Sequence, residues 1–138
     1  MTRLPLRLLA LAALSSFAWN AHASIAQDAG AGLQGTKWRL VSLGLDPVTG
    51  STPTLHLEAN GLVGGSTGCN TVKATYASDG AALAFGPIGQ TRKYCAAVFA
   101  TERAYVAMLD DVRGYTVNGN TLVLTGGNGE TLATFQTK

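Results

Sequence analysis

Thr54-Leu55-His56-Leu57-Glu58 alternates polar and apolar residues, and the turn dipeptide Asn60-Gly61 follows it closely. A period of two places Leu55 and Leu57 on one face of a β-strand. Asn-Gly favours a type I′ turn between antiparallel strands. The stretch therefore predicts a β-hairpin whose return strand runs from Gly61 to Gly65.

Short segments of the same kind lie on both sides of this hairpin. They predict strands over 37–43, 70–76, 83–85, 115–117, 121–125 and 131–135, with 88–94 as an edge segment. Ser78-Asp79-Gly80 and Asn118-Gly119 are further hairpin-turn signals. Gly64-Gly65-Ser66-Thr67-Gly68 is too rich in glycine for an ordinary strand interior, and it predicts a bulge or a close approach of two backbones.

One helix is predicted over about 101–113. Its apolar stripe consists of Tyr105, Met108, Leu109 and Val112, which are spaced i, i+3, i+4 and i+7. We expect Thr101 to cap the helix and Glu102 to occupy its first turn, and Gly114 is a suitable stop signal. Many short strands and one helix predict a β-rich α+β fold, in which a small antiparallel sheet curls and the helix covers one opening or face.

The beginning of the chain has the pattern of an export signal. Arg3 and Arg7 precede the uncharged apolar run 8–17, and Ala21-His22-Ala23 fits the cleavage rule. The alternative is a retained membrane anchor, but the run is shorter than the roughly 20 residues that span a bilayer. We therefore expect a cleaved signal peptide over 1–23, a flexible arm over 24–34 and a single domain over 35–138. The expected location is periplasmic or secreted, without a stable membrane span after cleavage.

The charge of the chain depends on this signal peptide. The full sequence has 10 Lys and Arg against 8 Asp and Glu. Removal of Arg3 and Arg7 makes the two signs equal. Because nucleic-acid binding needs a basic face, the composition does not indicate a nucleic-acid partner. It does not indicate binding to acidic membranes either.

Cys69 and Cys95 are the two cysteines of the chain. In an oxidising compartment two cysteines are expected to pair. Such a disulfide would close a loop of about 27 residues and stabilise the fold by roughly 3–4 kcal/mol. The alternative is a pair of free, buried thiols that behave as small apolar residues.

Several motifs in order carry a resemblance to a known family. They are Gly35-Thr36-Lys37-Trp38, Thr67-Gly68-Cys69-Asn70, Phe85-Gly86-Pro87-Ile88, Thr91-Arg92-Lys93-Tyr94-Cys95 and the helix that carries Glu102. The chain thus resembles the META-domain, or HslJ-like, family from Gly35 to Phe135. Lys93-Tyr94 replaces the Met-Ala pair of the family's usual Thr-Arg-Met-Ala-Cys.

This resemblance implies a small, cracked β-barrel with one helix. It also implies an exported or envelope-associated protein with links to heat shock, drug tolerance, motility or virulence. The family has no agreed catalytic activity.

Four residues near the cysteines are candidates for a structural motif. Gly68 lets the backbone bend, Asn70 can hydrogen-bond the local backbone, and Pro87 fixes the chain after Phe85. The guanidinium of Arg92 could bind backbone carbonyls or a carboxylate such as that of Glu102, which would make it a structural clasp. The alternative role for Arg92 is contact with an anion or a partner.

We identify no catalytic, metal-binding or cofactor-binding residues. His56 is the one histidine after the signal peptide, and it lies on the outward phase of its strand. Asp110 and Asp111 are neighbours on the helix and point apart. We therefore expect a monomeric, non-enzymatic envelope protein that binds an unidentified protein partner or acts in envelope stress. The alternatives are a small-ligand or lipid carrier with a barrel cavity, and an inhibitor of a secreted hydrolase.

Overall fold

The structure is a computed structural model that describes residues 32–138. The predicted signal peptide and most of the predicted arm lie outside the described residues. The last residues of that arm belong to the fold, because Leu33 is fully buried and Gln34 forms a parallel bridge with Leu57. No helix in the described part of the chain is long and apolar enough to cross a membrane.

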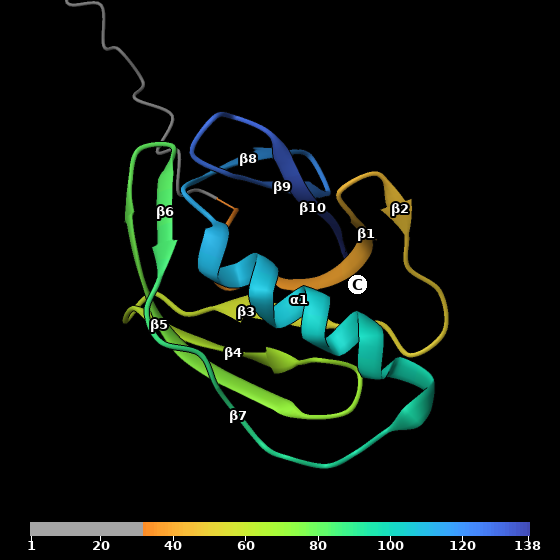
Figure 1. Ribbon diagram of the computed structural model, residues 1–138. Helices are drawn as coiled ribbons and strands as arrows, with labels where there is room; N and C mark the ends of the chain where they lie inside the picture. The colour runs from red at the N-terminus through yellow and green to blue at the C-terminus, as the bar shows by residue number, and fades with distance from the viewer. Residues whose placement is uncertain (1–31) are drawn as a thin grey trace, which may run out of the picture.

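Short strands and one α-helix make up the fold (Figure 1). The elements are β1 (Lys37–Leu43), β2 (Asp46–Pro47), β3 (Thr54–Leu57), β4 (Leu62–Ser66), β5 (Thr71–Asp79), β6 (Ala82–Phe85), β7 (Gly89–Gln90), the 3-10 helix η1 (Ala96–Val98), α1 (Phe99–Asp111), β8 (Gly114–Asn118), β9 (Thr121–Thr125) and β10 (Thr131–Thr137).

The strands close into an antiparallel barrel. The hydrogen-bonded order is β1-β3-β4-β5-β6-β8-β9-β10, and β10 pairs with β1 to complete the ring. β2 and β7 are short additions that pair with β1 and β5. The predicted β-rich α+β fold with a barrel and one helix is therefore confirmed.

One seam of the barrel is thin. β6 and β8 share a single residue pair, Ala82 with Gly114. A Cβ on Gly114 would lie 2.9 Å from the Thr125 hydroxyl oxygen and 3.2 Å from the Ala81 carbonyl oxygen. Gly114 is thus the first residue of β8, where it allows close approach of two chain segments. It does not stop the helix, because α1 ends at Asp111.

The first hairpin differs from the predicted type I′ turn. That turn needs a positive φ at both central residues. Gly61 has φ +84°, but no non-glycine residue in 32–138 has a positive φ, Asn60 included. The turn instead spans Glu58 to Gly61, with the Gly61 amide donating to the Glu58 carbonyl at 3.2 Å. The return strand therefore begins at Leu62.

The glycine-rich return strand contains a close backbone approach. A Cβ on Gly65 would lie 2.2 Å from the Thr54 carbonyl oxygen, whereas a Cβ on Gly64 would meet nothing within 4 Å. The pairing of β4 with both neighbours is regular at these positions, so the strand has no bulge there.

The barrel interior is filled by side chains. α1 lies across the opening between β8–β10 and β3–β5 (Figure 1). The predicted stripe of the helix is buried, and the Tyr105 ring packs edge-on to Phe135 at 6.4 Å between centroids. The Tyr105 hydroxyl donates to the Thr54 carbonyl at 3.1 Å, which ties the helix to β3.

The beginning of α1 differs from the prediction. Val98 is the N-cap residue and no side chain caps the helix, so Thr101 lies inside the helix. A turn of 3-10 helix, η1, immediately precedes Phe99, the first residue of α1.

Candidate functional site

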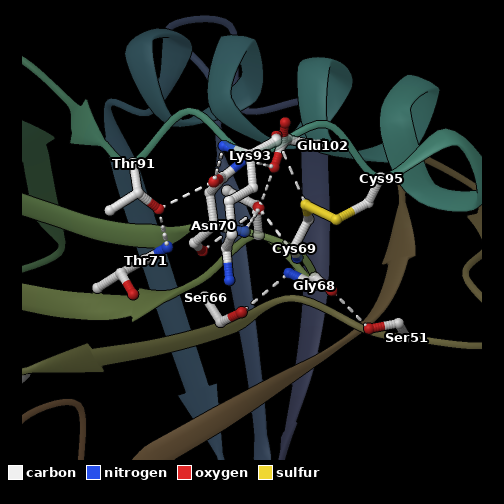
Figure 2. Close-up of a disulfide and its surroundings, with 11 residues drawn as sticks. Ser51, Ser66, Gly68, Cys69, Asn70, Thr71, Thr91, Lys93, Cys95 and Glu102 are labelled. Carbon is white, nitrogen blue, oxygen red and sulfur yellow. Dashed lines mark hydrogen bonds between the residues drawn. A yellow bond between two sulfur atoms is a disulfide. The ribbon is translucent and has the colours of Figure 1, made fainter.

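Three buried polar side chains meet beside the disulfide. Figure 2 shows two of them, Asn70 and Glu102, next to Cys69 and Cys95. Thr67, Asn70 and Glu102 are the buried polar or charged residues among 32–138. Buried polar groups are costly unless they are hydrogen-bonded. Every fully buried side-chain nitrogen or oxygen in the described residues has a hydrogen-bond partner.

A tight turn between β4 and β5 positions the first two of these residues. The backbone amide of Thr67 donates to the backbone carbonyl of Asn70 at 2.8 Å, and the Thr67 hydroxyl accepts from the backbone amide of Asn70 at 2.8 Å. Gly68 has φ +93°, and a Cβ there would lie 2.6 Å from the Ser51 carbonyl oxygen. The turn therefore requires glycine at position 68, as the predicted backbone bend indicated.

The side-chain amide of Asn70 joins three segments of the chain. Its Oδ1 accepts from the Lys93 amide at 2.7 Å and the Thr91 hydroxyl at 2.9 Å. Its Nδ2 donates to the Lys93 carbonyl at 2.9 Å and to Oε2 of Glu102 at 2.7 Å. These bonds use both donors and both acceptor sites of the amide. Asn70 thus binds a distant segment and the helix, in addition to its local turn.

Glu102 lies in the first turn of α1 with its carboxylate directed into this cluster. Its Oε2 accepts from the Thr67 hydroxyl as well as from Asn70. Charge-assisted bonds of this kind are stronger than neutral ones. A carboxylate is also favoured in the first turn of a helix by the helix dipole.

The disulfide reinforces the junction at which the β4–β5 turn, the segment 91–95 and the first turn of α1 meet. Cys69 and Cys95 are bonded, with 6.0 Å between their Cα atoms, a distance typical of disulfides. The bond joins the β4–β5 turn to the residue before η1. The pairing expected from the cysteine count is therefore present, and the described residues contain no free cysteine.

Arg92 does not have the predicted contact with Glu102. Within 32–138 its guanidinium has no hydrogen bond or ion pair, and the residue is exposed. Thr67 and Asn70 occupy the inner side of the carboxylate instead. Arg92 is therefore not a structural clasp in this fold.

The other candidate residues have simpler surroundings. Pro87 is exposed between β6 and β7. His56 is half-buried, and its Nδ1 lies 3.1 Å from the Thr36 carbonyl oxygen. Asp110 and Asp111 are exposed on α1. No group of three or more potential metal-ligating residues occurs in the described part of the chain.

Sequence reasoning missed Thr67 and the inward direction of Glu102. A signal for the second was present, because Glu102 precedes Tyr105 by three residues and Leu109 by seven. That spacing places it on the buried stripe of the helix. A glutamate on such a stripe needs buried donors, and Thr67 and Asn70 provide them.

An exposed aromatic pair lies beside the buried cluster. Tyr94 is 75% exposed and Phe99 is 41% exposed, with 5.4 Å between ring centroids. The guanidinium carbon of Arg103 lies 5.7 Å from the centroid of the Phe99 ring, within cation–π range. Arg92 and Lys93 adjoin the pair and are exposed. We name the set Arg92, Lys93, Tyr94, Phe99 and Arg103 the basic aromatic patch.

The patch borders a hollow of about 360 Å³. Its walls come from the segment 90–94 and from the first turn of α1, with Asn70 and Glu102 behind. The hollow is open to solvent, in contrast to the filled barrel interior.

Comparison with known proteins identifies the family. A family profile for the META domain matches residues 31–138. An NMR structure of a protein from Burkholderia xenovorans is 28% identical, with a TM-score of 0.63, over 80% of this chain and 86% of that one.

Two further solved structures are similar in fold. A crystal structure of a DUF4847 family protein from Bacteroides vulgatus is 14% identical, with a TM-score of 0.63, over 78% of this chain and 95% of that one. A second NMR structure is 22% identical, with a TM-score of 0.60, over 75% and 90% of the two chains. A comparison with curated proteins gives no match. The match over residues 31–138 shows that the chain belongs to the META domain family.

Proposed function

We propose that this META-domain protein is a non-enzymatic, exported protein of the bacterial envelope that acts by binding another protein. The observation that carries the proposal is the exposed pair Tyr94 and Phe99 on a rigidly held junction. Large aromatic side chains are usually buried, and exposed ones are enriched at protein interfaces.

The buried cluster supports a structural role better than a catalytic one. Asn70 uses its whole hydrogen-bonding capacity on neighbouring residues, and the Thr67 hydroxyl donates to Glu102. A general base or nucleophile needs a group directed at a substrate. In the cluster these groups are directed at each other.

The filled barrel is evidence against the carrier alternative. Trp38, Leu55, Leu57, Leu109 and Phe135 are almost completely buried in the interior. A barrel of this size holds a ligand only if side chains leave room for it. No particular observation favours the hydrolase inhibitor, which would be one kind of protein-binding function.

Export is supported by the signal-peptide pattern of residues 1–23 and is compatible with the disulfide. A role in envelope stress is supported only by the family resemblance. The resemblance also agrees with a function without catalysis, because META domains have no agreed reaction.

Affinity capture tests this proposal. A carboxyl-terminally tagged protein is cross-linked in living cells before and after heat stress, and the envelope fraction is analysed by mass spectrometry. We expect a specific partner that a tagged, unrelated exported protein does not capture. Amino-terminal sequencing of the same material should begin at Ser24. Absence of a specific partner in both conditions would contradict the binding role, and an intact amino terminus in the cytoplasm would contradict export.

A further inference from the structure

We propose that the basic aromatic patch is a docking surface for an extended, acidic segment of another protein. This inference rests on the proposed binding function and assigns its surface and the chemistry of its partner. Three observations carry it: the exposure of the aromatic pair, the fixed backbone beneath it, and the local excess of positive charge.

The aromatic residues have the properties of an interface anchor. Tyr94 and Phe99 contact each other, and Arg103 lies over Phe99. Tyrosine and arginine are enriched among the residues that contribute most binding energy. A partner side chain that enters the adjoining hollow of about 360 Å³ would contact the rings without rearrangement of the barrel core.

The backbone around Tyr94 is held on both sides. The amide and carbonyl of Lys93 are bound by Asn70 at 2.7 and 2.9 Å, and Cys95 is joined to Cys69. Tyr94 thus lies between two anchored residues, although its own ring is exposed. Preorganisation of this kind lowers the conformational entropy lost on binding. The buried cluster would therefore hold the segment that carries Tyr94 in a fixed position for binding.

The charge of the patch favours an acidic partner. The stretch 80–101 contains Arg92 and Lys93 and no Asp or Glu. Arg103 adds a third positive charge. Glu102 is the acidic residue that lines the hollow, and its Oε2 is occupied from the inner side by Thr67 and Asn70. The patch therefore has more positive than negative groups, which attract and orient a segment rich in carboxylates.

A protein segment fits these features better than a membrane surface does. The cations border a hollow with an aromatic wall, whereas binding to anionic lipid is typically driven by a cluster of several basic residues. After removal of Arg3 and Arg7 the chain has equal numbers of basic and acidic residues. We therefore assign the patch to a peptide-like ligand, and vesicles enter the test as a competing ligand.

Fluorescence anisotropy with synthetic peptides tests this assignment. The probes are labelled peptides in which Glu alternates with Leu and Phe, matched peptides with Gln in place of Glu, and vesicles that contain anionic lipid. The protein is the purified chain with its disulfide intact. We expect the Glu peptide to bind more tightly than the Gln peptide, with an affinity that falls as salt is added.

Variants at the patch should weaken this binding. We expect Tyr94→Ala, and separately Arg92→Glu with Lys93→Glu, to raise Kd by about tenfold or more. Lys37→Glu with Arg39→Glu is the matched control, because it makes the same charge change at exposed positions of β1. The control should change Kd by no more than about twofold. Thermal unfolding establishes that every variant remains folded.

Several results would overturn the assignment. Equal losses in the control and patch variants would indicate non-specific electrostatics, and equal binding of Glu and Gln peptides would refute an acidic ligand. Patch-dependent binding of vesicles without binding of peptides would assign the patch to a membrane surface. If the patch variants still capture the cellular partner, the binding function stands and this surface is wrong. If no partner is captured at all, the binding function itself fails.

Discussion

Substitution of Asn70 by Asp is the sharpest test of the buried cluster. The change keeps the shape and both acceptor contacts, but it replaces the donor Nδ2 with an oxygen. That oxygen would face the Lys93 carbonyl at 2.9 Å and Oε2 of Glu102 at 2.7 Å. Both contacts would change from attractive to repulsive.

The cost of Asn70→Asp follows from these contacts. A neutral hydrogen bond contributes about 1 kcal/mol and a bond to a charged group about 1.5–3 kcal/mol. Placing a second carboxylate beside that of Glu102 in a buried site adds repulsion, so we expect a loss of about 4–5 kcal/mol in the free energy of unfolding. A domain has only about 5–15 kcal/mol in total. The variant should therefore be close to unfolding at ambient temperature.

Urea unfolding followed by circular dichroism measures this loss. Asn120→Asp is the matched control, because Asn120 is exposed and the same chemical change there should stay within about 0.5 kcal/mol. A loss for Asn70→Asp of less than about 1 kcal/mol, or equal to that of the control, would refute the view that the Asn70 donors hold the junction together.

Three further changes test other parts of the fold. Replacing Cys69 and Cys95 together by Ser should lower the free energy of unfolding by about 3 kcal/mol, and an unchanged urea midpoint would contradict this. Gly65→Ala should cost at least about 1–3 kcal/mol because its Cβ would meet the Thr54 carbonyl, while Gly64→Ala should be nearly neutral in the same urea assay. Burial raises the pKa of Tyr105, so above about pH 10 the unfolded chain releases this proton first. The free energy of unfolding should then fall by about 1.4 kcal/mol per pH unit from this group, with its contribution complete below pH 10. Tyr105→Phe should remove that part of the alkaline slope, and an unchanged slope would argue against burial of an un-ionised phenol.

Local patterns predicted many of the secondary-structure elements. The alternation in 37–43 and 121–125 matches β1 and β9 residue for residue. The stripe of Tyr105, Met108 and Leu109 identified the buried face of the helix. Such patterns succeed because burial on one face imposes the period of the element on neighbouring residues.

Two element boundaries differ from the predictions. Threonine is a favoured N-cap residue, but Thr101 lies inside α1, which begins at Phe99 after a 3-10 turn and has no side-chain cap. Asn60-Gly61 is a typical central pair of a type I′ turn, but the central residues of the observed turn are Ala59 and Asn60. At the helix the missing cap costs about 1 kcal/mol, which the packing of the buried stripe outweighs. In the hairpin the Asn60 side chain still supports the turn, because its Oδ1 accepts from the Leu62 amide at 3.1 Å.

The candidate site was predicted only in part. The cysteine pairing and the bend at Gly68 could be inferred from compartment and composition. The exposure of Arg92 could not be inferred, because an exposed and a buried guanidinium have the same sequence signature. Asn70 was expected to bind only its local turn. It also binds the backbone of Lys93, which is 23 residues later in the sequence.

The strands, the helix face, the disulfide and the family motifs are thus properties of the chain read in order, because each depends on the spacing of neighbouring residues or on a count of two cysteines. Closure of β10 on β1, the junction around Asn70 and the exposure of Arg92 and Tyr94 depend on residues that meet only after folding. The physical reason is that a hydrogen bond depends on the distance between two groups in space and not on their separation in the sequence. Glu102 accepts from donors in a turn 32–35 residues earlier, and Arg92, which is ten residues away in the sequence, is exposed to solvent.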